Sequence, residues 1–367
     1  MRSLLRFGNP SEAGLNSEKL LEALNVLEGG VKDGVYPGFV ALVARKAVIA
    51  LYEAEGYAQL IPEVRPMIRE AVFDLASITK PICTATLTLK IVERGLLDLE
   101  TPLSEFLDGW DRGWRKNVRI KHLLTHSSGL PAWLPLYKTC RGKSEFLNVI
   151  TQLDCEYEPG FKIIYSDLGF ILLGFILESV SELSLDRLSK NEIFEPLKMS
   201  ETMFKPIGSL KAKAVATENC PWRGRVLVGE VHDENAYALG GVAGHAGLFS
   251  TAYDLAVFSQ MMLNRGFYGL VRILREETVE KAVKVWVEDG FRRFGLGWAK
   301  PLGLALPHDS YGHTGFTGTS IWISPKLDLF AILLTNRIHP SRNNPACGRI
   351  DDVRAAFHRL IVEAIVD

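Results

Sequence analysis

Residues 73–80 read Phe-Asp-Leu-Ala-Ser-Ile-Thr-Lys and lead directly into a long apolar stretch. Ser77 and Lys80 form the smallest unit that can make a hydroxyl nucleophilic without a histidine. If residues 78–94 are helical, both side chains lie on one helical face, within reach of each other. The unpaired N–H groups and partial positive charge at a helix amino terminus favour alkoxide character on Ser77. The motif therefore predicts covalent acyl transfer through a serine ester.

The motif alone is weak, because a solvated helix start capped by Ser77 or Thr79 would look the same. Its surroundings favour a buried site. Apolar residues precede Ser77, Pro81 is tolerated in a first helical turn, and the expected helix stops at Gly95, a favourable C-cap. The first turns carry almost no charge, so a buried Lys80 would need a partner or a function. The sequence contains no second Ser-x-x-Lys.

Composition limits the possible partners. The 367 residues are 47% hydrophobic and 23% charged, with a formal net charge of −1, as in ordinary globular proteins. This balance gives no electrostatic footprint for nucleic acid or an anionic membrane surface. The longest apolar run, residues 170–177, is too short to span a bilayer. We therefore expect neither nucleic acid nor a membrane as a partner.

The cysteines and the start of the chain suggest a compartment. Five cysteines are scattered along the sequence without paired metal spacing, so we expect free thiols in a reducing environment and no metal site. The first ten residues lack the apolar core of a signal peptide. Both observations predict a cytoplasmic location.

Strand patterns lie at both ends of the chain, with helical patterns between them. We expect helices over 16–31, 168–180 and about 350–365, and strands over 39–44, 47–54, 295–298, 319–324 and 329–335. Polar connections are expected around 108–117 and 205–232. This order predicts an α/β (α+β) fold in which both ends complete one sheet beside a helical insertion. We expect one domain over 1–367, with an α/β lobe at about 1–75 and 240–367 and a helical lobe at about 76–239.

A second candidate element is Tyr165-Ser166-Asp167, which follows a turn at 158–160 and precedes the apolar helix. Tyr165 on its own also fits an interfacial aromatic whose hydroxyl bonds to the backbone. Its place at the entry to a buried helix suits a residue held over a cleft. Because the free pKa of tyrosine is near 10, a tyrosine base must share its proton with a nearby cation, and Lys80 is the candidate.

A third element, residues 312–319, reads Gly-His-Thr-Gly-Phe-Thr-Gly-Thr and precedes an apolar strand. Closely spaced glycines let a backbone approach a ligand, and a strand-edge N–H can donate to it. The same composition also fits a plain hairpin turn.

In this order, Ser77-x-x-Lys80, Tyr165-Ser166-Asp167 and His313-Thr314-Gly315 resemble the class C β-lactamase and penicillin-binding-protein superfamily of serine hydrolases. The family motifs are Ser-x-x-Lys, Tyr-x-Asn and Lys-Thr-Gly or His-Thr-Gly. Segments 73–80, 123–131, 244–251 and 294–298 also resemble family segments in family order, so the resemblance covers about residues 10–365. It implies a β-lactamase/transpeptidase-like fold, an antiparallel sheet flanked by helices with a helical subdomain.

The resemblance also implies roles. Ser77 would attack a carbonyl carbon and become acylated, and Lys80 would deprotonate it directly or through Tyr165. Which of Lys80 and Tyr165 holds the proton stays open at this stage. The backbone N–H groups of Ser77 and Phe316 would form the oxyanion hole. The family needs no metal or cofactor, and the expected partner is a small-molecule substrate.

The substrate-facing residues depart from the family pattern. Asp167 replaces the usual asparagine, so an amide donor is lost and a carboxylate stands near Lys80. His313, followed by Thr314 and Gly315, replaces lysine and weakens the positive charge that greets a substrate carboxylate. Both changes point away from an efficient β-lactamase and toward esterases, D-aminopeptidases or amidases. The segment around His245 also resembles relatives that act on cell-wall muropeptides.

Three functions therefore compete. The first is a serine hydrolase acting on small esters, amides or D-amino-acid or muropeptide-type peptides. The second is a penicillin-binding protein or sensor that acylates with slow turnover, or a true β-lactamase. The third is a catalytically silent scaffold, which the joint presence of Ser77, Lys80 and Tyr165 disfavours. No Gly-x-Ser-x-Gly elbow occurs, so an α/β-hydrolase triad is excluded on motif grounds.

Overall fold

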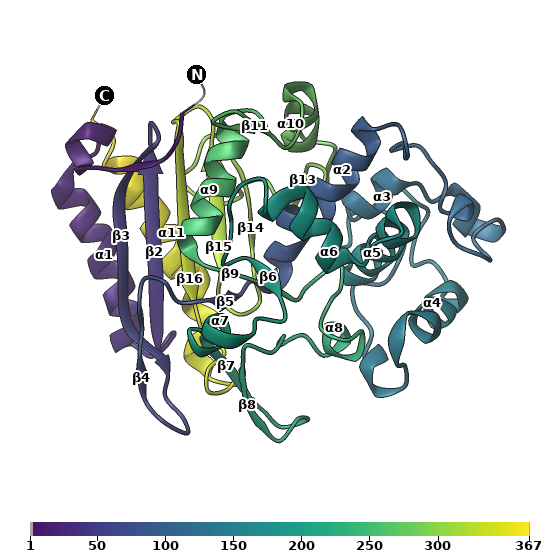
Figure 1. Ribbon diagram of the computed structural model, residues 1–367, viewed down its shortest axis with the longest axis horizontal. Helices are drawn as coiled ribbons and strands as arrows, with labels where there is room; N and C mark the ends of the chain where they lie inside the picture. Colours follow the sequence, from purple (N-terminus) through teal and green to yellow (C-terminus); the bar gives the residue numbers. More distant parts are fainter. Residues whose placement is uncertain (1–2, 367) are drawn as a thin grey trace.

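The computed structural model describes residues 3–366 and is built around a seven-stranded sheet (Figure 1). The strands follow the order β1-β3-β2-β16-β15-β14, and β4 pairs with β3. Their bounds are β1 Arg6–Phe7, β2 Gly38–Arg45, β3 Val48–Gln59, β4 Arg65–Pro66, β14 Tyr311–Thr314, β15 Ser320–Ser324 and β16 Leu329–Thr335. Antiparallel pairing of β2 with β16 joins the two ends of the chain. The expected sheet with contributions from both ends is confirmed.

The sheet is mixed rather than wholly antiparallel, because β1 pairs with β3 in parallel. Parallel neighbours need a long connection between them. The chain supplies one here, since α1 (Ser17–Lys32) and β2 lie between the two strands.

Both faces of the sheet are covered. On β2, Phe39, Ala41 and Val43 point into a core shared with α1 and α11 (Ile350–Glu363). The alternate residues Val40 and Leu42 point into the main core, where α9 (Ala252–Leu263) packs on β2 and β16. The period of two along the strand thus buries β2 on both sides.

Helices α2 to α6 gather beside the sheet (Figure 1). They are α2 Thr86–Glu93, α3 Ile120–Leu124, α4 Gly142–Gln152, α5 Asp167–Ser181 and α6 Leu185–Ser189. Helix α5 is largely apolar and nine of its 15 residues are buried, so it forms the centre of this region. The lobe boundaries given above stay a prediction.

The segment after Ser77 differs from the expected single helix over 78–94. Ser77 lies in a 3-10 turn, Ala76–Ile78, which is followed by a π-helical turn, Lys80–Ala85, and only then by α2. The hydroxyl of Thr86 donates to Pro81 O at 2.8 Å, so a side chain competes for a backbone oxygen that would otherwise accept only from backbone N–H groups of the helix. Such competition and π-turns distort helices locally. The expected stop is correct, because α2 ends at Glu93 and Gly95 takes a φ of 73°.

Two other expectations were wrong. Within the expected polar connection at 205–232, the chain forms α7 (Gly208–Ala212) and a hairpin of β7 (Ala216–Cys220) and β8 (Arg225–Val228). The strands of this hairpin are short, and polar residues interrupt the apolar alternation by which a strand is predicted from sequence. Residues 295–298 form a turn, closed by Gly295 N donating to Trp298 O at 2.8 Å, after the two-residue strand β13 (Arg293–Phe294).

The short elements complete the molecule. They are β5 Phe73–Asp74, β6 Met203–Phe204, α8 Glu234–Ala238, β9 Leu248–Ser250, β10 Phe267–Tyr268, β11 Val271–Arg272, α10 Glu276–Val283 and β12 Val287–Glu288. Strand β9 lies between β5 and β6 and so brings the segment before Ser77 beside residues 244–251.

The five cysteines are free, as expected, while the cytoplasmic location itself stays a prediction. Over residues 3–366, a single helix long and apolar enough to cross a membrane is not found. Only α5 together with residues 185–194 meets the length and hydropathy criteria, as a pair bent by 76°.

Candidate active site

The structure brings Ser77 and Lys80 into direct contact. Lys80 Nζ donates to Ser77 Oγ at 3.0 Å and to the backbone oxygen of His245 at 3.0 Å. The Lys80 side chain is fully buried, and its Nζ lies 2.7 Å from Asp167 Oδ1. A buried ammonium needs such compensation. Asp167, one of the two residues that depart from the family pattern, supplies it.

The charges around Lys80 determine which group holds the proton. Burial alone would lower the pKa of Lys80, but Asp167 and Tyr165 outweigh burial and raise it above the ordinary value. Burial raises the pKa of Tyr165, and the nearby Lys80 charge and the Ser77 hydroxyl only partly offset this rise. In the resting protein, Lys80 is therefore an ammonium and Tyr165 a phenol. The Lys80 ammonium lies 4.9 Å from the centre of the Tyr165 ring.

Residues 312–319 dock onto the turn that carries Ser77. The hydroxyls of Thr317 and Thr319 donate to the backbone oxygens of Asp74 and Leu75 at 2.8 and 3.1 Å. A Cβ on Gly315 would lie 2.5 Å from Leu75 O, so only glycine allows this approach. Phe316 follows directly and is 47% exposed. Within residues 3–366, neither the Ser77 nor the Phe316 amide donates to another protein group.

His313 lies in β14 and carries no charge near neutral pH. Burial, with the Lys80 charge second, lowers the pKa of His313 to about 3. Its Nδ1 lies 2.8 Å from Thr314 O, which places the ring proton there. His313 therefore offers no positive charge to a substrate, unlike the lysine it replaces.

His126 connects its own loop to the segment that carries Tyr165. Its Nδ1 accepts from Ser166 N at 3.0 Å, and its backbone oxygen accepts from Ile164 N. Its ring lies 4.3 Å from the Tyr165 ring, centre to centre. Burial lowers the pKa of His126 well below the ordinary value. The imidazole is therefore uncharged and packs against the Tyr165 ring.

A cavity of about 400 Å³ opens over Ser77, and we call it the Ser77 cavity. Predicted site residues Ser77, Tyr165, Asp167 and Phe316 line it. Lys80 lies beneath Ser77, and His313 packs behind Tyr165 at 5.8 Å between ring centres. A larger cavity of about 590 Å³ beside α8 contains none of the predicted residues.

The sequence patterns pointed to fewer than half of the residues that line the cavity. The lining residues that they did not single out are Ala76, Trp133, His232, Asp233, Glu234, Ala246 and Arg342. The run His232-Asp233-Glu234 before an apolar turn was a usable signal, because adjacent titratable residues are unusual next to a buried segment. Arg342 gave no signal, since its partners are more than 100 residues away in sequence.

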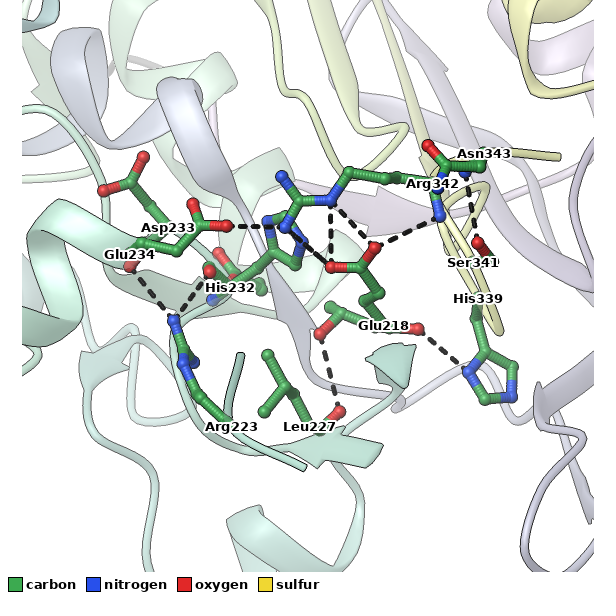
Figure 2. Close-up of polar contacts among 12 residues, drawn as sticks. Glu218, Arg223, Leu227, His232, Asp233, Glu234, His339, Ser341, Arg342 and Asn343 are labelled. Atoms are coloured by element: carbon green, nitrogen blue, oxygen red, sulfur yellow. Dashed lines mark hydrogen bonds and ion pairs between the residues drawn. The ribbon is translucent and has the colours of Figure 1, made fainter. Parts of the chain in front are cut away.

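Arg342 lies between two carboxylates (Figure 2). Its Nη2 is 2.6 Å from Glu218 Oε2 and 2.7 Å from Glu234 Oε1. His232 Nε2 lies 3.1 Å from the same Glu218 oxygen. Burial alone would raise the pKa of Glu218, but hydrogen bonds from His232 and Arg342 hold it at about 2. The cation of Arg342 is thus already compensated within the protein.

Asp233 and His245 form a second pair in the wall, with Nε2 and Oδ1 2.9 Å apart. Burial opposes ionisation of Asp233, but the adjacent His245 outweighs it and holds the pKa of Asp233 well below the ordinary value. Because the backbone oxygen of His245 accepts from Lys80, this pair also fixes the segment that supports Lys80.

Comparisons with known proteins identify the family of this chain. The Beta-lactamase family model matches residues 24–355. A Salmonella typhimurium (strain LT2) protein named "Putative D-alanyl-D-alanine carboxypeptidase" is 35% identical over 93% of this chain and 88% of its own length. A protein of the same name from Salmonella paratyphi B is 34% identical over the same shares.

Solved structures share the fold. The octameric penicillin-binding protein homologue from Pyrococcus abyssi matches with a TM-score of 0.75 and 23% identity over 93% of this chain and 77% of its own. EstCE1, a hydrolase with promiscuous acyltransferase activity, matches with a TM-score of 0.77 and 21% identity over 94% and 98%. At these identities the likeness concerns the fold alone. The fold and the length of the family match together show that the chain belongs to the Beta-lactamase family.

Proposed function

We propose that this protein is a serine hydrolase that forms an acyl-enzyme at Ser77 and acts on small esters, amides or D-amino-acid or muropeptide-type peptides. The observation that carries the proposal is the contact of Ser77 Oγ with Lys80 Nζ at the floor of an open cavity. A fully buried lysine that touches a cavity-lining serine is hard to explain as structure alone.

The reaction would begin with loss of one proton from the Lys80–Tyr165 pair. Ser77 Oγ then attacks the carbonyl carbon, and its proton passes to that pair. The free amides of Ser77 and Phe316 are placed to donate to the oxyanion. The proton next goes to the leaving group as the acyl-enzyme forms, and water releases the acyl group by the reverse proton path.

The charges around the Ser77 cavity favour substrates that have no carboxylate to be bound by a cation of the protein. Lys80 and Arg342 each face carboxylates of the protein, and His313 is neutral. A β-lactam carboxylate would find little free positive charge in the Ser77 cavity. These features support the ester and amide side of the proposal, while the carboxypeptidase name of the relatives supports the peptide side.

A second candidate is a penicillin-binding protein that acylates and turns over slowly. The same Ser77–Lys80 contact supports it, because acylation needs no more than these groups. The two candidates differ only in the rate at which the acyl group leaves.

Intact-mass spectrometry with p-nitrophenyl butyrate, nitrocefin and a fluorescent penicillin tests the proposal. We expect rapid ester turnover and poor nitrocefin hydrolysis in the wild type, both lost in Ser77→Ala. The exposed Ser104→Ala is the matched control and keeps full activity. A stable penicillin adduct with little turnover would favour the second candidate. No adduct and no turnover with any probe would contradict both.

A further inference from the structure

The residue before Ser77 has an unusual backbone. Ala76 has a φ of 47°, in the left-handed region that side-chain-bearing residues other than asparagine and aspartate rarely adopt. Such a conformation costs free energy and persists only where the surroundings enforce it. Because Ala76 and Ser77 share a peptide group, this conformation sets the direction of the Ser77 N–H.

A buried carboxylate accepts a hydrogen bond from the backbone N–H of Ala76 itself. Asp74 is 2% exposed, and its Oδ1 accepts from Ala76 N at 2.9 Å, the Asx-turn pattern. Its Oδ2 accepts from His232 N at 2.7 Å. Burial raises the pKa of Asp74, and the two N–H donors act against that rise, since each needs an oxygen acceptor.

The second hydrogen bond leads to the opposite wall of the Ser77 cavity. The His232 ring stacks on Phe316 with 5.6 Å between centres and 22° between planes. Glu218 and Arg342 hold the far side of the same ring (Figure 2). The Asp74 carboxylate therefore contacts two structures that position the expected oxyanion-hole amides. One is the turn that carries the Ser77 N–H, and the other is His232, whose ring packs on Phe316.

We propose that Asp74 is a positioning residue, which fixes the Ala76–Ser77 peptide and the His232–Phe316 wall relative to each other. The inference rests on the proposed role of Ser77. Asp74 does not touch substrate, and its effect is transmitted through Ala76 and His232.

Two substitutions separate positioning from simple support of the fold. In Asp74→Asn the carbonyl oxygen accepts from only one of the two amides, and the new NH₂ faces the other. Ala76→Gly removes the cost of the left-handed conformation, so the turn no longer depends on Asp74. If Asp74 acts through this turn, glycine at position 76 restores activity in the Asp74→Asn background.

The test measures p-nitrophenyl butyrate turnover and thermal unfolding for the wild type, both single variants, the double variant and Ser77→Ala. We expect kcat of Asp74→Asn to fall by roughly tenfold to hundredfold with KM nearly unchanged, because misplacing reacting groups slows the chemical step. On a logarithmic scale, the loss caused by Asp74→Asn should be smaller by at least about half in the Ala76→Gly background than in the wild-type background.

Full kcat in folded Asp74→Asn, or no recovery in the double variant, would overturn the inference. If Asp74→Asn does not fold, Asp74→Ser, whose shorter hydroxyl reaches at most one amide, replaces it in the same cycle. If the wild type itself shows no Ser77-dependent turnover, the proposed function fails and the inference falls with it. The wild-type measurement thus distinguishes the two failures.

Discussion

Asp167 decides the charge state of the residues around Ser77. Its carboxylate is 2.7 Å from the Lys80 ammonium, where an asparagine would be neutral. Burial alone would lower the pKa of Lys80, but the negative charge of Asp167 stabilises the protonated amine and helps to raise that pKa. Burial is the main reason that the pKa of Tyr165 is raised, and the charge of Asp167 adds to this rise. Both groups that can act as the base are thus held in their protonated forms at neutral pH. The protein should therefore work best at alkaline pH.

Replacing Asp167 by asparagine should move this dependence. The ammonium loses its anionic partner and the phenolate loses a repelling charge, so the pKa of Lys80 and that of Tyr165 both fall. The rising limb of kcat/KM against pH should shift to lower pH by about one unit or more, whichever group loses the proton. Ester turnover by Asp167→Asn and the wild type between pH 6 and 10.5 measures it. An unmoved or upward-shifted limb would contradict the charge assignment.

Single residues near the motifs were predictable, and distant ones were not. Ser77, Lys80, Tyr165, Asp167 and the strand before Phe316 were singled out from local patterns, and the structure brings them together around one cavity. The sequence shows Asp74 only as part of the segment that precedes Ser77, because its two hydrogen bonds depend on the tertiary fold. Local sequence carries no record of contacts closed by the fold.

At the scale of elements, β14 and the turn at Ser77 meet through Gly315. A Cβ there would lie 2.1 Å from Thr319 Oγ1 and 2.5 Å from the backbone oxygen of Leu75. The backbone oxygen belongs to the turn that carries Ser77 and cannot rotate away. The distance between the strand and the turn therefore depends on the absence of one methyl group.

Gly315→Ala should push the strand from the turn. We expect a loss of about 1–3 kcal/mol in the free energy of unfolding, as for other overpacked sites, and a fall in kcat of at least roughly tenfold from misplaced donors. Gly29→Ala in α1 is the matched control, since nothing lies within 4 Å of its added Cβ. That variant should keep its activity and its stability or gain some. Equal behaviour of both variants would refute the close-approach argument.

The elements themselves were predictable where their periodicity was long. The α1, α5 and α11 helices and strand β2 follow the expected ranges closely, while β3 runs on to Gln59, beyond its expected end at residue 54. The π-turn after Ser77 could not be predicted, because it arises where the Thr86 hydroxyl bonds to the backbone oxygen of Pro81. The β7–β8 hairpin was not predicted, because its strands are short and partly polar, and because the Glu218 side chain points inward and binds Arg342.

At the scale of the whole molecule, Arg342 joins parts that are far apart in sequence. It lies in the segment after β16 and binds Glu218 of β7 and Glu234 of α8. Glu218 is almost wholly buried, with 3% of its side chain exposed. Without the Arg342 guanidinium, this buried carboxylate would keep His232 and a long hydrogen bond from the backbone N–H of residue 342. One guanidinium therefore connects the C-terminal strands to the wall of the Ser77 cavity.

Arg342→Met should destabilise the protein in a pH-dependent way. At pH 7 the loss should be about 3 kcal/mol, because removing one partner strands a buried charge. The pKa of Glu218 lies near 2 in the folded protein against an ordinary 4.5, so its stabilising effect is complete above about pH 4.5 and is lost as the pH falls toward 2. The difference in Tm between the variant and the wild type should therefore narrow over that range, as Glu218 becomes protonated. Arg349→Met, which breaks the exposed pair with Asp33, should change Tm little at any pH. A Tm difference for Arg342→Met that is small at pH 7, or equal at pH 7 and pH 3, would show that this cluster does not hold the parts of the molecule together.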